Sequence, residues 1–305
     1  MIIGDDMKDR KQHVIKMAHQ LFIEKGFQAT SIQDILDYSR ISKGTFYNYF
    51  SSKNELLIAL FKTIYKKLEL DRNELLIGQD SANIDIFITQ IELQMKTNRA
   101  NKLFSLFEEV NFSNDVELKQ FIKLGNLSML RWVYNRFTDI FDDSTKPYLL
   151  DCAIMFMGLL QYNLKYYALG HESNASIHQV VRYSVDRVVK MVDEVTKSRV
   201  QLIEPEVLES WFPDCKKNDQ EFQQKLHQAV FSLKKALSTC EDPTKYTELL
   251  DFVQDELLHS KDPRVFLIES ALLSLKTSNE IFSFEELQKL DQLISEHFNQ
   301  QVEKS

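Results

Sequence analysis

The residues of this sequence best suited to chemistry lie between positions 31 and 50, in the segment SIQDILDYSRISKGTFYNYF. The segment is typical of two short helices joined by a turn of three to four residues, an arrangement that can place its second helix in the major groove of DNA. Phe46 and Phe50 stand four residues apart and therefore share one face of that second helix. Because two exposed phenylalanines would be costly, we expect this face to be buried.

The opposite face of the second helix carries small and polar residues that suit contacts with DNA. Gly44 has no side chain to hold the backbone away from a phosphate or a base edge. Thr45 and Asn48 offer short hydrogen-bonding groups, and Asn can pair bidentately with adenine. Tyr47 and Tyr49 can place their hydroxyl groups on phosphates.

The starts of two helices in this region suit phosphate groups. Ser42 begins the second helix, so free backbone N–H groups and Lys43 meet there and favour an anion. Lys53 stands at the start of the next helix and adds a second cation beside free amides. The alternative is an ordinary helical hairpin whose aromatic residues are all core, and for Phe46 and Phe50 we accept that structural role.

The elements that must position these residues are helices. A helical apolar pattern predicts a first helix that ends at Gly26, and Ser31-x-x-Asp34 and Ser52-x-x-Glu55 are capping boxes that begin later helices. With only 7 Gly and 5 Pro, the chain has little material for hairpins, so we predict an all-α fold that continues helical to its end. Five further helices are expected in the middle of the chain, at 84–98, 100–111, 115–141, 146–170 and 176–197.

Composition argues against several classes of protein. The sequence has no GxGxxG, GxxxxGK[ST], GxSxG or HExxH motif, and Cys152, Cys215 and Cys240 form no CxxC pair. We therefore expect no catalytic residues, no metal and no cofactor, and we predict that the protein is not an enzyme. The longest apolar run, 153–160, is far shorter than the ~20 residues that span a bilayer. The N-terminus lacks the apolar core of a signal peptide, so we expect a cytoplasmic protein without a membrane partner.

The charge distribution is compatible with DNA binding despite a net charge of −8. Residues 1–67 hold 11 Lys+Arg against 7 Asp+Glu, residues 68–198 hold 14 against 18, and residues 199–305 hold 12 against 20. Because exposed charges are screened beyond about 8 Å at physiological salt, a phosphate responds to the local field. A basic head on an acidic body can therefore bind DNA through the head.

The segments GFQATSIQDI and ISKGTFYNYFSSKNELL resemble the DNA-binding head of the tetracycline-repressor (TetR) family of bacterial transcriptional regulators. The close match covers about residues 8–68. The resemblance implies an all-α homodimer with a three-helix head and a helical body that binds a small effector. It also implies a set of DNA contacts in the head: Thr30, Ser31, Gln33, Ser42, Lys43, Gly44, Thr45, Tyr47, Asn48, Tyr49 and Lys53.

Two positions depart from the family pattern. The family usually has a small residue where Leu36 stands, and glycine in the turn where Arg40 stands. Arg40 is therefore expected to adopt a positive φ, a strained but tolerable conformation for one residue. Neither departure touches the face predicted to meet DNA.

The body, predicted at 69–198, has an interior rich in aromatic residues and methionine. One interpretation is an apolar cavity for the effector, since such pockets are apolar with few polar groups and Met adapts to varied shapes. The other is plain helical core, which is favoured residue by residue, and for Glu108 a solvated helix face. The residues predicted to line the pocket are Phe104, Phe107, Glu108, Met129, Trp132, Phe156, Tyr162 and Tyr166.

The helices near 146–170 and 176–197 correspond to those that build the dimer in the resembled family. In the second, Val181, Val185 and Val188 belong to a β-branched patch that an interface or a core would require. The family's usual chain ends near residue 198, so residues 199–305 are predicted to be an additional helical extension that packs on the body. No motif occurs in this extension.

These observations together predict a ligand-responsive transcriptional regulator, with its helix-turn-helix at about 31–50 inside a DNA-binding domain at 8–68. We expect a repressor that binds a palindromic double-stranded DNA operator as a homodimer and is released by a small hydrophobic effector of unknown identity. The alternatives are a helical enzyme, which would need a polar constellation, and a protein-interaction scaffold, which only the acidic extension supports.

Overall fold

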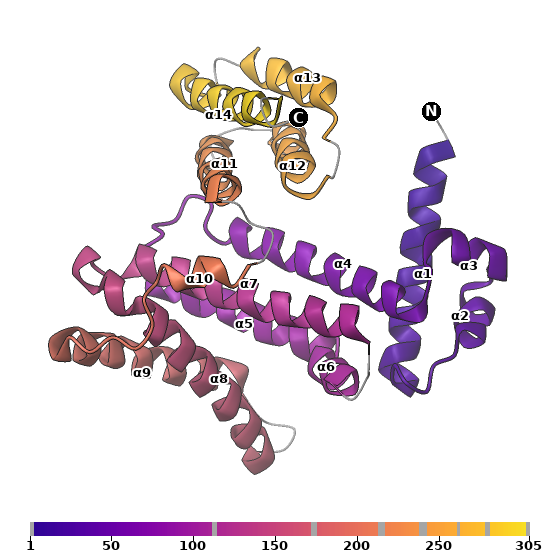
Figure 1. Cartoon of the computed structure of the whole chain (residues 1–305), viewed down its shortest axis with the longest axis horizontal. Coiled ribbons are helices and arrows are strands. Elements are labelled where there is room, and N and C mark those ends of the chain that lie inside the picture. The colour runs from indigo at the N-terminus through magenta and orange to yellow at the C-terminus, as the bar shows by residue number, and fades with distance from the viewer. Residues whose placement is uncertain are drawn as a thin grey trace. The chain divides into compact units, whose positions relative to one another are not determined.

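The computed structural model describes residues 3–111, 115–171, 176–212, 217–237, 243–260, 263–277 and 281–302. All regular secondary structure in these ranges is helical, which confirms the predicted fold class (Figure 1). The chain divides into two compact units. Unit 1 comprises residues 1–75 and 81–208, and unit 2 comprises residues 76–80 and 209–305.

Unit 1 begins with the head, whose short helices start at the predicted caps. Ser31 and Asp34 form the reciprocal capping box expected from the sequence, and the side chains of Ser42 and Ser52 each accept a backbone N–H of the turn that follows. The head helices are α1 (Ile3–Lys25), α2 (Ile32–Ser39), α3 (Lys43–Tyr49) and α4 (Lys53–Glu74).

The body of unit 1 follows the predicted helices to within a few residues. The helix expected at 146–170 begins as a 3₁₀ turn around Pro147 and becomes α-helical only at Leu149, as suits a residue without a backbone N–H in a first turn. The body elements are α5 (Ile84–Ala100), α6 (Leu103–Asn111), α7 (Val116–Ile140), the 3₁₀ helix η1 (Asp143–Tyr148), α8 (Leu149–His171), α9 (Ile177–Ser198) and α10 (Val207–Ser210).

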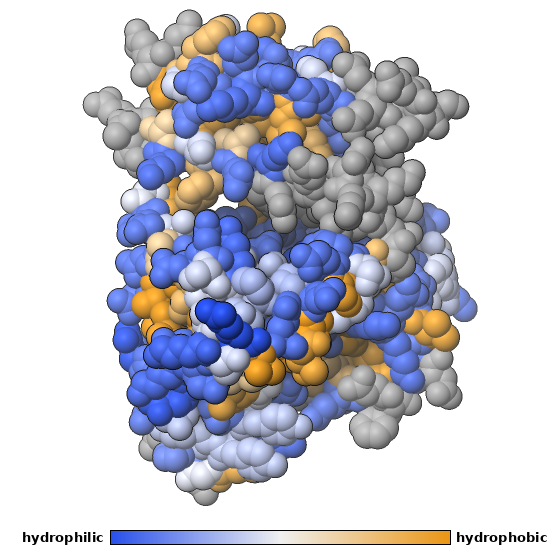
Figure 2. Space-filling view, turned by 60° about the vertical axis from the view of Figure 1, so that its left-hand side comes forward, coloured by the Kyte–Doolittle hydropathy of each residue, from blue (hydrophilic) through white to orange (hydrophobic). Residues whose placement is uncertain are grey.

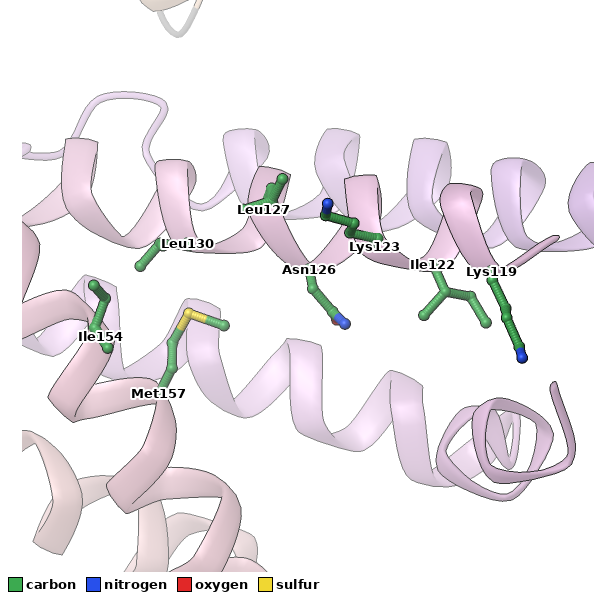
Figure 3. Close-up of a pocket in the computed structure, with 8 residues that line it drawn as sticks. All are labelled: Lys119, Ile122, Lys123, Asn126, Leu127, Leu130, Ile154 and Met157. Carbon is green, nitrogen blue, oxygen red and sulfur yellow. The ribbon is translucent and has the colours of Figure 1, made fainter. Parts of the chain in front are cut away.

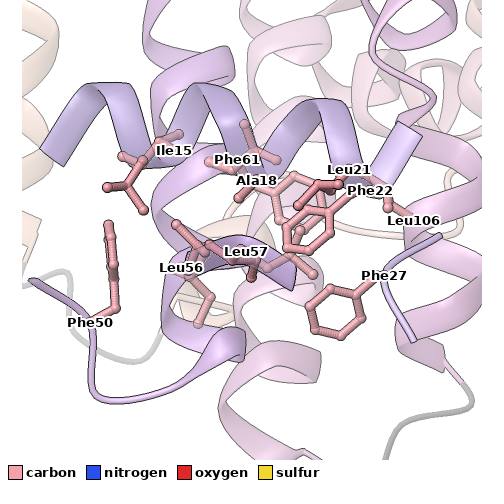
Figure 4. Close-up of a cluster of buried hydrophobic side chains, with 14 of the residues drawn as sticks. Ile15, Ala18, Leu21, Phe22, Phe27, Phe50, Leu56, Leu57, Phe61 and Leu106 are labelled. Carbon is pink, nitrogen blue, oxygen red and sulfur yellow. The ribbon is translucent and has the colours of Figure 1, made fainter. Parts of the chain in front are cut away.

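One hydrophobic cluster joins the head to the body. Phe22, Phe50 and Phe61 of the head lie in the same cluster as Leu103 and Leu106 of α6 (Figure 4). Apolar side chains buried in this way contribute about 1.5–3 kcal/mol each, so the shared cluster is a large part of what holds the short head helices in place. The predicted boundary between head and body therefore crosses a continuous core.

The valine patch of α9 belongs to the core of unit 1. Val181, Val185 and Val188 are all buried within their own chain, in a helix that packs along α8 and α5. Of the two interpretations of this patch, the structure supports the core.

Residues 199–208, which were predicted to belong to the extension, lie in unit 1. Asp151 of α8 is buried, and its two carboxylate oxygens accept the backbone N–H groups of Leu202 and Ile203 at 2.7 and 3.1 Å. Leu208 is buried at the end of this segment. A buried carboxylate is stable when its oxygens are hydrogen-bonded in this way, so Asp151 anchors the segment that follows α9.

Unit 2 has a hydrophobic core of its own. Its helices are amphipathic, and the leucines at 226, 233, 250, 275 and 290 are fully buried. Its elements are α11 (Lys217–Ala236), α12 (Thr244–His259), α13 (Val265–Lys276) and α14 (Phe284–Val302). The packing of this extension on the body stays a prediction.

The surface is mixed in polarity. On the face shown in Figure 2, hydrophobic side chains reach the surface in separate patches between hydrophilic ones. No helix among the described residues is both long and apolar enough to cross a membrane. Cys152 is a buried free thiol, and Cys215 and Cys240 lie outside the described residues.

Arg40 adopts the left-handed conformation expected from the sequence, with φ 54° and ψ 45° at the C-terminal cap of α2. A left-handed conformation costs an L-residue roughly 1–2 kcal/mol, and the greater freedom of glycine in the unfolded chain offsets about 0.5–1 kcal/mol of the possible gain. Arg40→Gly should therefore raise the free energy of unfolding by about 0.5–1 kcal/mol.

Urea unfolding followed by circular dichroism measures this change. Arg40→Ala is the matched control, since it removes the same charge but keeps the Cβ atom that causes the strain. An equal gain in both variants would show that the charge, not the backbone conformation, is responsible.

Candidate nucleic-acid interface

The phase of α3 is set by two buried aromatic rings. Phe46 and Phe50 are 0% and 1% exposed, as predicted, and their ring centroids lie 5.8 Å apart. The hydroxyl oxygen of Ser42 accepts the backbone N–H of Thr45 at 3.1 Å and so fixes the first turn. With one face buried and the start of the helix capped, the opposite face of α3 must face solvent.

The solvent face of α3 carries the residues predicted to read DNA. Lys43, Gly44 and Asn48 are exposed, and Tyr47 is 46% exposed with its ring edge-on to Phe46. Tyr49 is half-buried against the head core. The side chains therefore combine a cation, an amide and phenol groups on one short helix, which are donors suited to phosphates and base edges.

The start of α2 contributes a second group of polar residues. Ser31 is exposed, and the Asp34 carboxylate accepts its backbone N–H at 2.8 Å. The pKa of Asp34 lies well below its usual range. The main cause is the hydrogen bond from the Lys25 ammonium, and the hydrogen bonds from Ser31 add to it. Gln33 is exposed and donates its amide N–H to Asp37 at 2.8 Å.

Thr30 has a structural role in this turn. Its side chain is fully buried, and its hydroxyl donates to the carbonyl oxygen of Gly26 at 2.7 Å. Gly26 itself has φ +84°, a conformation that favours glycine. The threonine predicted as a DNA contact therefore closes the loop between α1 and α2.

Lys53 also acts within its own chain. Its ammonium donates to the carbonyl oxygens of Phe27 and Thr30, both at 2.7 Å, and lies 4.4 Å from the centre of the Phe27 ring. Burial lowers the pKa of Lys53, and the nearby charge of Glu109 opposes that shift. Sequence placed a cation at the start of α4, but only the fold shows that it fastens α4 to the loop between α1 and α2.

Residues from the body bind the same loop and the end of α1 before it. The Glu109 carboxylate of α6 accepts the backbone N–H of Gln28 at 2.8 Å. A Cβ atom on Gly26 would come within 3.1 Å of the same carboxylate, so glycine suits this position on two counts. Lys102 donates to the carbonyl oxygen of Ile23 at 3.1 Å. No pattern in the sequence marks these contacts, because they join residues about 80 positions apart.

The structure thus brings most of the predicted DNA contacts to the surface of two neighbouring helices and turns two of them inward. Thr30 is buried, and the Lys53 ammonium is bound to backbone carbonyls. Thr45, Tyr49 and Lys53 are half-buried. The exposed residues of the predicted set are Ser31, Gln33, Ser42, Lys43, Gly44, Tyr47 and Asn48.

The eight residues predicted to line an effector pocket lie in different surroundings, from buried core to exposed surface. Phe156 packs in the core, 5.5 Å between ring centroids from Phe87, and Phe107 packs on Phe61 at 5.1 Å. Met129 and Trp132 are half-buried. The remaining four side chains are exposed: Phe104, Glu108, Tyr162 and Tyr166.

A groove of about 430 Å³ does exist between α7 and α8 (Figure 3). Its size is within the range of small-molecule sites. Apolar residues of both helices line one part, and lysine and asparagine side chains of α7 line the other. The lining residues are Lys119, Ile122, Lys123, Asn126, Leu127, Leu130, Ile154 and Met157. Across the described ranges, no three His, Cys, Asp or Glu residues are grouped as a metal site would require.

Residues 14–60 match the family described as bacterial regulatory proteins, tetR family. The chain is 26% identical over 294 residues to the uncharacterised HTH-type transcriptional regulator YerO of Bacillus subtilis (strain 168), covering 94% of this chain and 96% of YerO. It is 26% identical to YuxN of the same organism, also an uncharacterised HTH-type transcriptional regulator, over 62% of this chain and 66% of YuxN.

The head alone matches further relatives, among them the HTH-type transcriptional repressor NemR of Escherichia coli (strain K12). That match is 29% identical over 68 residues, or 22% of this chain and 34% of NemR. No solved structure matches the chain. The matched residues include the whole of α2 and α3 with their exposed polar face. The N-terminal head is therefore a DNA-binding domain of the tetR family of bacterial regulatory proteins, and the chain is a transcriptional regulator.

Proposed function

We propose that this regulator is a cytoplasmic repressor that binds a palindromic operator as a homodimer and is released by a small hydrophobic effector. The observation that carries the proposal is the exposed polar face of α3, held in phase by the burial of Phe46 and Phe50. NemR, which matches over the head, is by name a repressor. The groove between α7 and α8 has room for an effector.

The dimer in this proposal forms through the outer faces of α8 and α9. Tyr162, Tyr166 and Leu169 are 58%, 61% and 72% exposed and lie on one side of α8, and Tyr183 of α9 is 53% exposed. Exposed aromatic and apolar groups at helical spacing are typical of protein interfaces. Two copies joined here present two α3 helices to successive major grooves, about 34 Å apart or a multiple of it.

Release requires that the body affects the head. The loop between α1 and α2 is held by Lys53 and by Glu109, and Lys102 binds the last turn of α1 just before it. An effector that binds more tightly to a body conformation with α6 displaced lowers operator affinity by its differential affinity for the two states. In this proposal Glu109 is the residue through which α6 acts on the DNA-binding head.

The proposed DNA face is tested by Tyr47→Ala. The ring points away from the core, so the variant should keep its helix content while it loses at least about tenfold in affinity for an operator selected from random duplexes. Lys43→Gln should reduce the slope of log affinity against log salt by about one unit. Lys289→Gln, on an exposed lysine of unit 2, is the control and should leave both measurements unchanged. Wild-type affinity in Tyr47→Ala would refute the assignment of α3.

The proposed dimer is tested by Tyr166→Glu and Leu169→Glu. A twofold interface brings each residue near its own copy, so either change introduces two like charges and should weaken dimerisation by about 100-fold. Sedimentation at micromolar concentration measures this change, and circular dichroism should report a folded chain. Val185→Glu is the contrasting variant, since it buries a charge within one chain and should unfold the protein. A wild-type monomer that binds a palindromic operator with full affinity would contradict the mechanism.

The proposed coupling is tested by Glu109→Ala. Loss of the carboxylate removes a hydrogen bond to the exposed Gln28 amide, which contributes about 0.5–1.5 kcal/mol net, so hydrogen exchange at residues 26–31 should accelerate about two- to tenfold. Operator affinity should fall in parallel. Glu108→Ala, on the exposed neighbouring carboxylate, is the matched control. If both variants exchange alike at this loop, Glu109 does not couple α6 to the head.

A further inference from the structure

Two arginines of unit 1 reach its interior, one fully buried and one partly buried, and only the first has a complete set of partners. Arg136 of α7 is 3% exposed. Its guanidinium donates to Asp139 at 2.7 Å, to the side-chain oxygen of Gln90 at 3.1 Å and to the carbonyl oxygen of Ser81 at 2.9 Å. The buried cation is therefore paired with a carboxylate and hydrogen-bonded in three directions, as a structural arginine requires.

Arg72, in the last turn of α4, has no such set. One Nη donates to the side-chain oxygen of Gln94 at 3.1 Å and lies 3.8 Å from the sulfur of Met129. The guanidinium lies 4.1 Å from the centre of the Trp132 ring. Its Nε is buried without a hydrogen-bond partner, and within the described residues no carboxylate forms an ion pair with it. Burial lowers the pKa of Arg72 to about 10, against an opposing effect of Glu69.

This difference needs a physical explanation. A buried cation without a carboxylate is expensive, and replacing one by an apolar residue of similar volume is often neutral or stabilising. The stacking on Trp132 and the bond to Gln94 compensate only in part, because both partners are neutral. The Arg72 guanidinium therefore has neutral partners and no anionic one.

We propose that Arg72 is the binding site of a small organic monocarboxylate, held between α4, α5 and α7. The carboxylate accepts from the guanidinium, which favours planar bidentate acceptors. Trp132 and Met129 provide an apolar surface for an aromatic or aliphatic body. Arg72 is only partly buried, so a ligand can approach it from solvent.

The local charge favours a monoanion. Arg136 is already neutralised by Asp139, and the nearby polar side chains Gln94 and Asn98 are uncharged amides that bond to each other at 3.2 Å. One unpaired guanidinium balances one negative charge, whereas a phosphate dianion would leave a buried charge without compensation. The site is separate from the groove between α7 and α8, which different residues line, so the inference goes beyond the proposed function and does not depend on it.

The first arm of the test compares the two arginines by substitution in the full chain. Arg72→Met should leave the melting temperature unchanged or raise it, because it removes an unpaired buried charge. Arg136→Met should lower the melting temperature, because it leaves Asp139 without its partner and Gln90 and Ser81 without a donor. If both variants lose stability equally, Arg72 is a structural residue and the proposal is wrong.

The second arm measures binding by titration calorimetry with 2-naphthoate and its neutral analogue 2-naphthamide. The wild type and Arg136→Lys should bind the carboxylate and not the amide, and Arg72→Met should bind the carboxylate about 30-fold more weakly or not at all. Absence of naphthoate binding by the wild type, equal affinity for the amide, unchanged affinity in Arg72→Met, or binding of inorganic phosphate in its place would each overturn the proposal. Neither arm involves DNA or the dimer, so failure here leaves the proposed function standing.

Discussion

The function of the head depends on the burial of Phe46 and Phe50. An isolated helix as short as α3 is not stable in water, so its existence and its orientation both come from the packing of that one face. Once two rings four residues apart are fixed in the core, the remaining side chains have no choice of direction, and Lys43, Gly44 and Asn48 must face solvent. The surface that we propose to bind DNA therefore follows from the burial of the opposite face of the helix.

The core that receives these rings does not belong to the head alone. Leu103, Leu106 and Leu118 of the body are buried in the same cluster, and Glu109 adds a polar contact from the body to the loop that precedes α2. Because side chains in a close-packed core fill the space between them, a displacement of one element is transmitted to its neighbours. In the proposed mechanism, a movement of α6 would change the surroundings of α2 and α3 without any contact between effector and DNA.

Sequence predicted the head well because local signals agree with the fold there. The spacing of Phe46 and Phe50 and the capping serines are local signals, and the structure has each of them as expected. The left-handed Arg40 was expected from the glycine that the resembled family has in this turn, and the structure has it too. Lys53 was harder, because a lysine at a helix start has the same pattern whether it faces a phosphate or the carbonyl oxygens of a distant loop. Only the tertiary fold, which brings Phe27 and Thr30 beside it, distinguishes the two.

In the body, sequence could not distinguish a ligand pocket from a plain core, because both are lined by apolar and aromatic residues. Phe156 is core, Tyr166 is surface, and the groove lies along residues of α7 that no aromatic pattern marked. The two arginines make the point most clearly. Asp139 lies three residues after Arg136 and Glu69 three residues before Arg72, so both pairs have helical spacing. Yet only Asp139 forms the ion pair, and Arg72 instead turns into a site of neutral partners. The direction of the side chain along its helix and the residues of the facing helices decide which arginine finds a carboxylate partner. At an arginine without one, the negative charge of a ligand contributes most to binding.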